Sequence, residues 1–109
     1  MAFIFFVFLL YATKLTPIAM RVIDNKETNR FEAEVDGHKA FIEYSVQPGI
    51  LSLNHTEVPK ELSGQGLASE MTEKVLLQIE LRGLKVIPVC PFTKKYIDKH
   101  PEWKSILAI

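Results

Sequence analysis

Residues 66–90, GLASEMTEKVLLQIELRGLKVIPVC, predict a helix that is followed at once by a strand. Four apolar residues in the first part recur at every fourth position: Leu67, Met71, Val75 and Ile79. This spacing places one apolar stripe along a helix over residues 66–83, and Gly83 is a residue type that commonly follows a helix. The nearly continuous apolar run at residues 84–90 then favours a strand in a buried, central position of a sheet.

Four segments before this helix are predicted to be short strands separated by turn residues: RVID at 21–24, RFEAEV at 30–35, AFIEYSV at 40–46 and ILSLNHTEV at 50–58. Asp-Gly at residues 36–37 is a strong hairpin signal, so the last three strands form an antiparallel meander. The helix joins this meander to strand 84–90, and a strand–helix–strand unit normally makes parallel neighbours. With PFTKKYIDKHPEW at 91–103 as a second, short helix, the sequence predicts a mixed α/β (α+β) fold.

The length and charge of the chain restrict its class. The 109 residues suffice for one domain with a modest core. Thirteen basic and thirteen acidic side chains leave no net charge, so no electrostatic field argues for nucleic acid or an anionic membrane as a partner. Cys90 is the only cysteine, which excludes an internal disulfide and a zinc site of paired cysteines. We expect a cytoplasmic monomer that binds no metal and no nucleic acid.

Residues 1–20 differ in composition from the rest of the chain. The apolar run from Ala2 to Ala12 is shorter than the ~20 residues that span a bilayer, and it lacks the basic leader and clear cleavage site of a signal peptide. Three interpretations stay open: a targeting or membrane-surface segment, an element packed on the domain, or an over-extended start with translation beginning at Met20. We favour the last, because domain-like sequence begins abruptly at Arg21, and we assign residues 21–109 to one domain.

Two glycines one residue apart, Gly64 and Gly66, stand directly before the long helix. A helix start exposes unpaired amide N–H groups and partial positive charge, and glycines leave room for a phosphate to reach them. A tight strand-to-helix turn that needs positive φ explains the pair equally well. The loop is not a Walker motif, because no Gly-Lys-Ser/Thr follows. Spacing alone leaves both interpretations open.

The chain resembles the small, single-domain GNAT acetyltransferases of the YjdJ type over residues 21–105. Four motifs in order carry the resemblance: HTEVP at 55–59, GQGLAS at 64–69, PVCPF at 88–92 and KHPEW at 99–103. The resemblance implies a GNAT fold that binds acetyl-coenzyme A where the central sheet splays open, and transfer of the acetyl group to an amine acceptor. It also implies the residues that contact the coenzyme: Val58, Ser63, Gly64, Gln65, Gly66, Leu67, Ala68, Cys90 and Phe92.

One residue departs from that family's pattern. The position three before the first glycine is usually Gln or Arg, and here it is Glu61. An inward-pointing carboxylate would repel a pyrophosphate, so we expect the Glu61 side chain to point to solvent. Lys94, Lys95 and Lys99 have two interpretations, a solvated helix face or contacts with the adenosine 3′-phosphate of the coenzyme.

Two residues on the strand before the phosphate loop, Glu57 and His55, are candidates for the base that deprotonates the amine. Other GNAT enzymes carry a carboxylate on the equivalent strand, and a spacing of two puts both side chains on one face. A surface charge at a strand end and a buried structural histidine are equally weighted alternatives.

Cys90 ends the strand that follows the long helix. Its thiol would contact the thioester, accept the acetyl group, or pack as a small apolar group. We favour the contact, because no basic neighbour in the sequence activates the thiol. Tyr96 is a weaker candidate for the acid that protonates the coenzyme thiolate.

Two other function classes stay open. A coenzyme A-binding module with little or no catalysis fits an acceptor site that a short domain leaves open. A membrane-surface protein would use residues 1–12 as its anchor. For the enzyme, the acceptor is a protein lysine, a protein N-terminus, a polyamine or a small metabolite.

Overall fold

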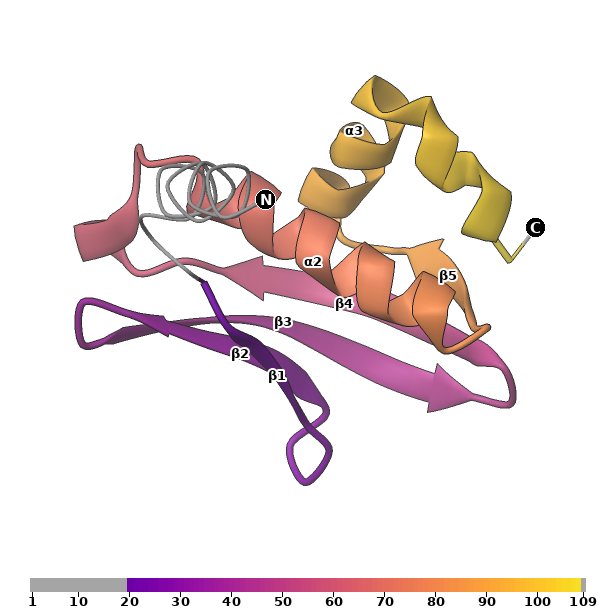
Figure 1. Ribbon diagram of the computed structural model, residues 1–109, viewed down its shortest axis with the longest axis horizontal. Coiled ribbons are helices and arrows are strands. Elements are labelled where there is room, and N and C mark those ends of the chain that lie inside the picture. Colours follow the sequence, from indigo (N-terminus) through magenta and orange to yellow (C-terminus); the bar gives the residue numbers. More distant parts are fainter. Residues whose placement is uncertain (1–19, 109) are drawn as a thin grey trace, which may run out of the picture.

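The computed structural model describes residues 20–108, which form a five-stranded sheet with helices packed on one face (Figure 1). The elements in chain order are β1 (Val22–Asn25), β2 (Arg30–Val35), β3 (His38–Gln47), β4 (Ile50–Glu57), the 3₁₀ turn η1 (Lys60–Leu62), α2 (Leu67–Leu81), β5 (Lys85–Pro88), α3 (Pro91–Lys99) and the 3₁₀ helix η2 (Pro101–Ile106). The strands lie in the order β1-β2-β3-β4-β5. The first four are antiparallel and β5 runs parallel to β4, so the predicted meander and strand–helix–strand unit are confirmed. Our interpretations of residues 1–19 lie outside the described residues.

The apolar stripe of α2 forms the centre of the core. All four residues that predicted the stripe are buried: Leu67, Met71, Val75 and Ile79. They belong to one cluster with fully buried side chains of the sheet, among them Phe31, Ile42 and Leu53. Burying a side chain of this size stabilises the fold by roughly 1.5–3 kcal/mol, so this interface holds α2 at a set position over β4.

The predicted central position of β5 was wrong. Among residues 20–108, β5 is one of the two edge strands of the sheet, because the chain after it forms helices rather than another strand. Part of its outer edge is nevertheless covered, since Val86 pairs with Leu107 and the Val86 carbonyl accepts a hydrogen bond from Ala108 N–H at 3.0 Å. The apolar run therefore reflects contacts with α2 and with this C-terminal segment rather than a strand on each side.

The predicted helix over residues 91–103 is interrupted. α3 ends at Lys99, and η2 begins at Pro101. A residue before a proline is disfavoured in the helical region, and His100 has φ −127° and ψ 71°. The half-buried Trp103 in η2 packs against the core.

A β-bulge in β4 decides the direction of every later side chain in that strand. Tyr44 of β3 pairs with Leu53, whereas its neighbour Glu43 pairs with His55, which leaves Asn54 as one extra residue in β4. Because side chains alternate between the faces of a strand, this extra residue reverses the alternation after Leu53.

Candidate functional site

The helix α2 begins without a side-chain cap. Its capping position is occupied by Gly66, and the hydroxyl of Ser63, three residues earlier, donates to the Lys60 carbonyl at 2.8 Å. The first helical hydrogen bond joins Glu70 N–H to the Gly66 carbonyl at 3.1 Å. The amides of residues 67–69 therefore have no acceptor within the helix, and they carry the partial positive charge of a helix start.

Both loop glycines adopt a left-handed backbone conformation, with φ of 80° at Gly64 and 73° at Gly66. The turn therefore requires residues that tolerate positive φ. A β-carbon built at either position would meet no atom of residues 20–108 within 4 Å. The packing of the described residues thus leaves the space above this loop open to a ligand.

A cavity of about 230 Å³ lies over this loop and the first turn of α2. Its lining comes from the end of β4, the loop, α2 and the start of α3: Val58, Leu62, Ser63, Gly64, Gly66, Leu67, Ala68, Ser69 and Phe92. Seven of the nine residues that we expected to contact a coenzyme are in this set, and the two outside it are Gln65 and Cys90. Sequence reasoning missed Leu62 and Ser69, although Ser69 stands in the first helical turn within the GQGLAS motif.

Glu61 does not line the cavity. Its side chain is 61% exposed, and its carboxylate lies 3.9 Å from Nδ1 of His38 in the β2–β3 hairpin. The expected solvent-facing orientation of this carboxylate is confirmed, so the anion is directed away from the uncapped helix start.

Cys90 lies where β4 and β5 separate. The two strands pair only where Ile50–Leu53 of β4 lies beside Lys85–Pro88 of β5. Just beyond the last pair, the Cys90 N–H donates to the Leu53 carbonyl at 2.8 Å. The Thr56 hydroxyl of β4 lies 3.5 Å from the Cys90 thiol. Since no other described strand pairs with this side of residues 54–57, the edge of β4 beside Cys90 is open within residues 20–108.

The pKa of the Cys90 thiol is set by opposing effects. Burial acts to raise the pKa, but hydrogen bonds from the Thr56 hydroxyl and from the Thr93 and Phe92 amides bring it below its ordinary value. The nearby Thr93 hydroxyl adds to the lowering of the pKa, although it is fully buried and meets the geometric criteria for a hydrogen bond with no group of residues 20–108. The sequence showed no activating neighbour because these groups are hydrogen-bond donors rather than cations.

Glu57 and His55 share one face of β4, as predicted, but it is the face opposite Thr56. The His55 Nε2 and a Glu57 carboxylate oxygen lie 3.2 Å apart, and both side chains are more than half exposed. The alternative of a buried structural histidine was therefore wrong. Thr56 instead pairs with the fully buried Ile42 and faces the helices. The pair on the open face and the thiol on the helical face thus flank β4.

Tyr96 is buried, and its pKa is raised, first by burial and then by the charge of Glu73. Its ring lies 4.2 Å from the ring of His100, centre to centre. Tyr96 lines a smaller second cavity and not the one over the glycine loop.

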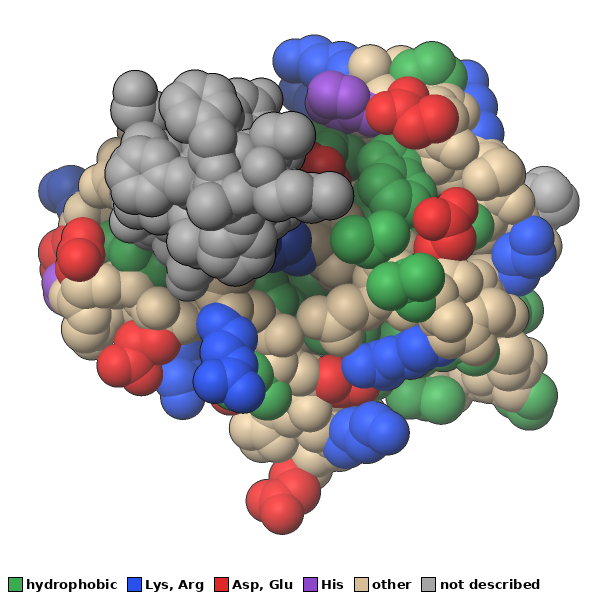
Figure 2. Space-filling model, viewed as in Figure 1, with side chains coloured by type: hydrophobic (Ala, Val, Ile, Leu, Met, Phe, Trp, Pro, Cys, Tyr) green, Lys and Arg blue, Asp and Glu red, His purple; other side chains and the backbone are tan. Residues whose placement is uncertain are grey.

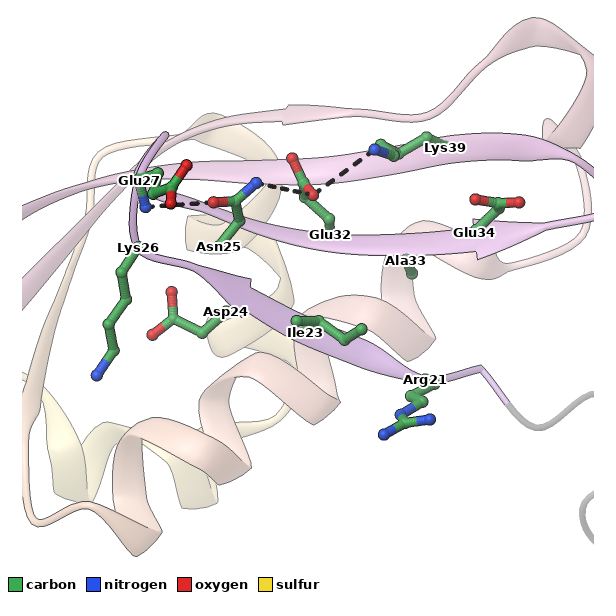
Figure 3. Close-up of a pocket in the computed structure, with 10 residues that line it drawn as sticks. All are labelled: Arg21, Ile23, Asp24, Asn25, Lys26, Glu27, Glu32, Ala33, Glu34 and Lys39. Atoms are coloured by element: carbon green, nitrogen blue, oxygen red, sulfur yellow. Dashed lines mark hydrogen bonds and ion pairs between the residues drawn. The ribbon is translucent and has the colours of Figure 1, made fainter.

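Another cavity, of about 640 Å³, lies elsewhere, along β1 to β3 (Figure 3). None of the residues predicted for the site lines it. Its floor holds a chain of polar contacts, in which Glu32 accepts from the Asn25 amide at 3.3 Å and lies 3.7 Å from the Lys39 ammonium.

Acidic and basic side chains are interspersed over the face shown in Figure 2, in keeping with the zero net charge. Within residues 20–108, no three His, Cys, Asp or Glu side chains cluster closely enough to hold a metal ion. In the same part of the chain, no helix is long and apolar enough to cross a membrane.

Comparison with known proteins agrees with this geometry. A family model described as GCN5-related N-acetyl-transferase matches residues 30–106. Protein NATD1 of Mus musculus is 28% identical over 85 residues, which cover 75% of this chain and 77% of that protein. The solution structure of a GCN5-like N-acetyltransferase candidate from Staphylococcus aureus superposes with a TM-score of 0.61 at 26% identity, covering 80% of this chain and 86% of the other.

Proposed function

The chain belongs to the GCN5-related N-acetyltransferase family, and we propose that it transfers an acetyl group from acetyl-coenzyme A to an amine acceptor. Within the family we place it with the small YjdJ type, on the four motifs that span residues 55–103. We further propose that residues 21–109 form the acetyltransferase domain.

One observation carries the proposal, which is the cavity over the uncapped start of α2. Free amides and partial positive charge make such a helix start an anion site, and the coenzyme pyrophosphate is the anion that fits this assignment. We assign the pyrophosphate to the amides from Gly64 to Ala68, because the Ser63 N–H, which we also expected to contribute, already donates to the Lys60 carbonyl at 3.1 Å. Gln65, which is exposed and outside the lining, would contribute its backbone amide.

The thioester end of the coenzyme is assigned to the gap between β4 and β5. Past Leu53, the open edge of β4 leaves backbone groups free to pair with an extended ligand arm. An arm that leads from the cavity along this edge would bring the thioester close to Cys90 and Thr56. Cys90 then contacts the sulfur region, in agreement with the role that we favoured for it.

The transfer needs a neutral amine. Glu57, with His55 beside it at 3.2 Å, takes the proton from the acceptor ammonium on the open face of the sheet. The amine nitrogen then attacks the thioester carbonyl, a C–N bond forms, and the C–S bond breaks. The coenzyme leaves as a thiolate and takes up the proton that the attacking nitrogen loses as the amide forms.

A coenzyme-binding module without catalysis is the second candidate, favoured by one observation. Glu57 and His55 are 57% and 53% exposed and lie on the face of β4 away from Cys90. A base in this position acts only if the acceptor reaches the thioester from the open face.

Turnover distinguishes the two functions. The full chain is incubated with acetyl-coenzyme A and a panel comprising a lysine peptide, a free peptide N-terminus, spermidine and small primary amines, and release of coenzyme thiol is followed. Acetylation of one class above the rate without protein supports the enzyme. Binding of acetyl-coenzyme A by calorimetry with no turnover supports the module, and absence of binding overturns both.

A further inference from the structure

Cys90 occupies the capping position of α3. The first hydrogen bond of this helix joins the Lys94 N–H to the Cys90 carbonyl at 3.0 Å. The earlier N–H groups, those of Phe92 and Thr93, therefore have no acceptor within the helix, and Pro91 has no N–H to offer. Because these amides lie beside the Cys90 sulfur, they place partial positive charge next to it, which favours the thiolate form.

A buried hydroxyl beside this thiol has no partner of its own. Thr93 is fully buried, and its hydroxyl finds no hydrogen-bond geometry with any group of residues 20–108. The other fully buried threonine, Thr72, shows the usual outcome, since its hydroxyl donates to the Ala68 carbonyl at 2.7 Å. Leaving a buried hydroxyl without a partner costs free energy. The Thr93 hydroxyl is one of the groups that lower the pKa of Cys90, so its acceptor is the sulfur in its thiolate form.

The reaction partner of this thiol must come from outside the chain. Cys90 is the only cysteine among the 109 residues, so no disulfide forms within one chain. Its side chain is only 5% exposed, and it lies where β4 and β5 separate, so a reagent needs a path through that gap. The proposed function places one thiol compound in the gap, which is the coenzyme A that each transfer releases.

We propose that Cys90 forms a mixed disulfide with coenzyme A, which closes the coenzyme site when coenzyme A is oxidised. The inference rests on the proposed function, because it takes the sulfur end of the coenzyme to lie beside Cys90. The co-reactant is the symmetrical disulfide of coenzyme A.

The exchange balances without a further oxidant. The Cys90 thiolate attacks one sulfur of coenzyme A disulfide, the S–S bond between the two halves breaks, and a new S–S bond to Cys90 forms. The second half leaves as a thiolate and takes up the proton that Cys90 released on ionising. One disulfide is consumed and one is formed, so an added dithiol reverses the modification.

Intact mass of the full chain follows the adduct during incubation with coenzyme A disulfide at neutral pH, and glutathione disulfide serves as a probe that lacks the coenzyme. We expect one coenzyme per chain, which dithiothreitol removes and Cys90→Ser lacks. Binding beside the thiol should make coenzyme A disulfide react at least about tenfold faster than glutathione disulfide at equal concentration, and excess acetyl-coenzyme A should slow it. In calorimetry, the modified chain should not bind acetyl-coenzyme A until it is reduced.

Thr93→Val tests the part of the buried hydroxyl. Loss of a donor to the thiolate should slow adduct formation by about three- to tenfold, because the thiolate fraction falls by more than its nucleophilicity rises. Thr93→Ser, which keeps a hydroxyl, should restore most of the rate. Thr72→Val is the matched control and should react as the wild type does, since Thr72 is equally buried but bonds to Ala68.

Three results would overturn the inference and leave the proposed function standing, with acetyl-coenzyme A still bound by the wild type. The first is no adduct with coenzyme A disulfide. The second is an equal rate with glutathione disulfide and no protection by acetyl-coenzyme A, which would show a generally reactive thiol. The third is an adduct that leaves acetyl-coenzyme A binding intact. If the wild type does not bind acetyl-coenzyme A, the proposed function and the inference fail together. Circular dichroism of each variant separates loss of reaction from loss of fold.

Discussion

The Thr56 hydroxyl lies 3.5 Å from the Cys90 thiol, and this contact joins two segments that are 34 residues apart in the chain. It lies at the point where β4 and β5 separate, close to the hydrogen bond that the Cys90 N–H donates to the Leu53 carbonyl. The contact ties the middle of the sheet to the start of α3 beside the assigned thioester position.

Thr56→Val removes the hydroxyl at nearly constant volume and should raise the pKa of Cys90. The wild-type pKa is lowered against the effect of burial by several donors, of which the Thr56 hydroxyl is the first. Ultraviolet titration of the thiolate should therefore shift to higher pH in Thr56→Val and return toward the wild type in Thr56→Ser. An unchanged titration would mean that the Thr93 and Phe92 groups alone control the thiol.

Gly64→Ala should reduce the affinity for acetyl-coenzyme A by more than its small loss of folding stability would explain. Positive φ makes any β-carbon cost about 1 kcal/mol or slightly more, although no atom of residues 20–108 lies in its way. Gly49→Ala is the matched control, because Gly49 has φ of 75°, equally open space and a place in the distant β3–β4 turn. Urea unfolding should show similar losses for both variants, and calorimetry should show reduced affinity only for Gly64→Ala. Equal affinity would remove the pyrophosphate from this loop.

Glu57→Gln should lower kcat by about 100- to 10,000-fold at neutral pH, the range typical of a general base. Glu34→Gln is the control, since Glu34 is an exposed carboxylate on β2 of the same sheet, opposite Lys39 of β3 in the strand register.

Cys90→Ala should keep much of the activity if the thiol only contacts the coenzyme. Loss of all activity in Cys90→Ala, with an acetyl adduct on Cys90 of the wild type by intact mass, would instead establish the covalent route.

Tyr44→Phe should destabilise the protein and change its response to alkaline pH. The buried Tyr44 hydroxyl donates to Asp24, which also accepts from Arg82 at 2.7 Å, so its loss should cost about 1–3 kcal/mol. Burial, followed by the Asp24 hydrogen bond, raises the Tyr44 pKa to about 12 from 10.0.

The sign of this pH effect follows from proton binding. Between pH 10 and about 12 the unfolded chain has released the tyrosine proton while the folded chain retains it, so rising pH favours unfolding. Urea unfolding across this range should show a steeper loss of stability in the wild type than in Tyr44→Phe. Parallel curves would contradict the assigned network.

A chain of residues 20–109 should fold and bind acetyl-coenzyme A. All five strands, α2 and α3 lie within it, and Met20 itself is buried in the core. Thermal unfolding and calorimetry should match the full chain. If the shorter chain aggregates while the full chain does not, residues 1–19 take part in the core and our boundary is misplaced.

The sequence by itself determined the features that depend on local spacing. The stripe from Leu67 to Ile79 marks α2 because the helical period of 3.6 is a property of the chain alone. A family resemblance predicted that the six adjacent residues 63–68 contact a coenzyme, and five of these six line the cavity over the start of α2. The pairing of His55 with Glu57 follows likewise from a strand period of two.

Only the tertiary structure decided which face those side chains occupy. Alternation continued from the buried Leu53 would have put His55 in the core, but the bulge at Asn54 shifts the register and turns it to the open face. The environment of Cys90 is equally non-local, since its polar neighbour Thr56 comes from another strand. Register and long-range contact arise from pairing between distant segments, and no spacing along one segment encodes them.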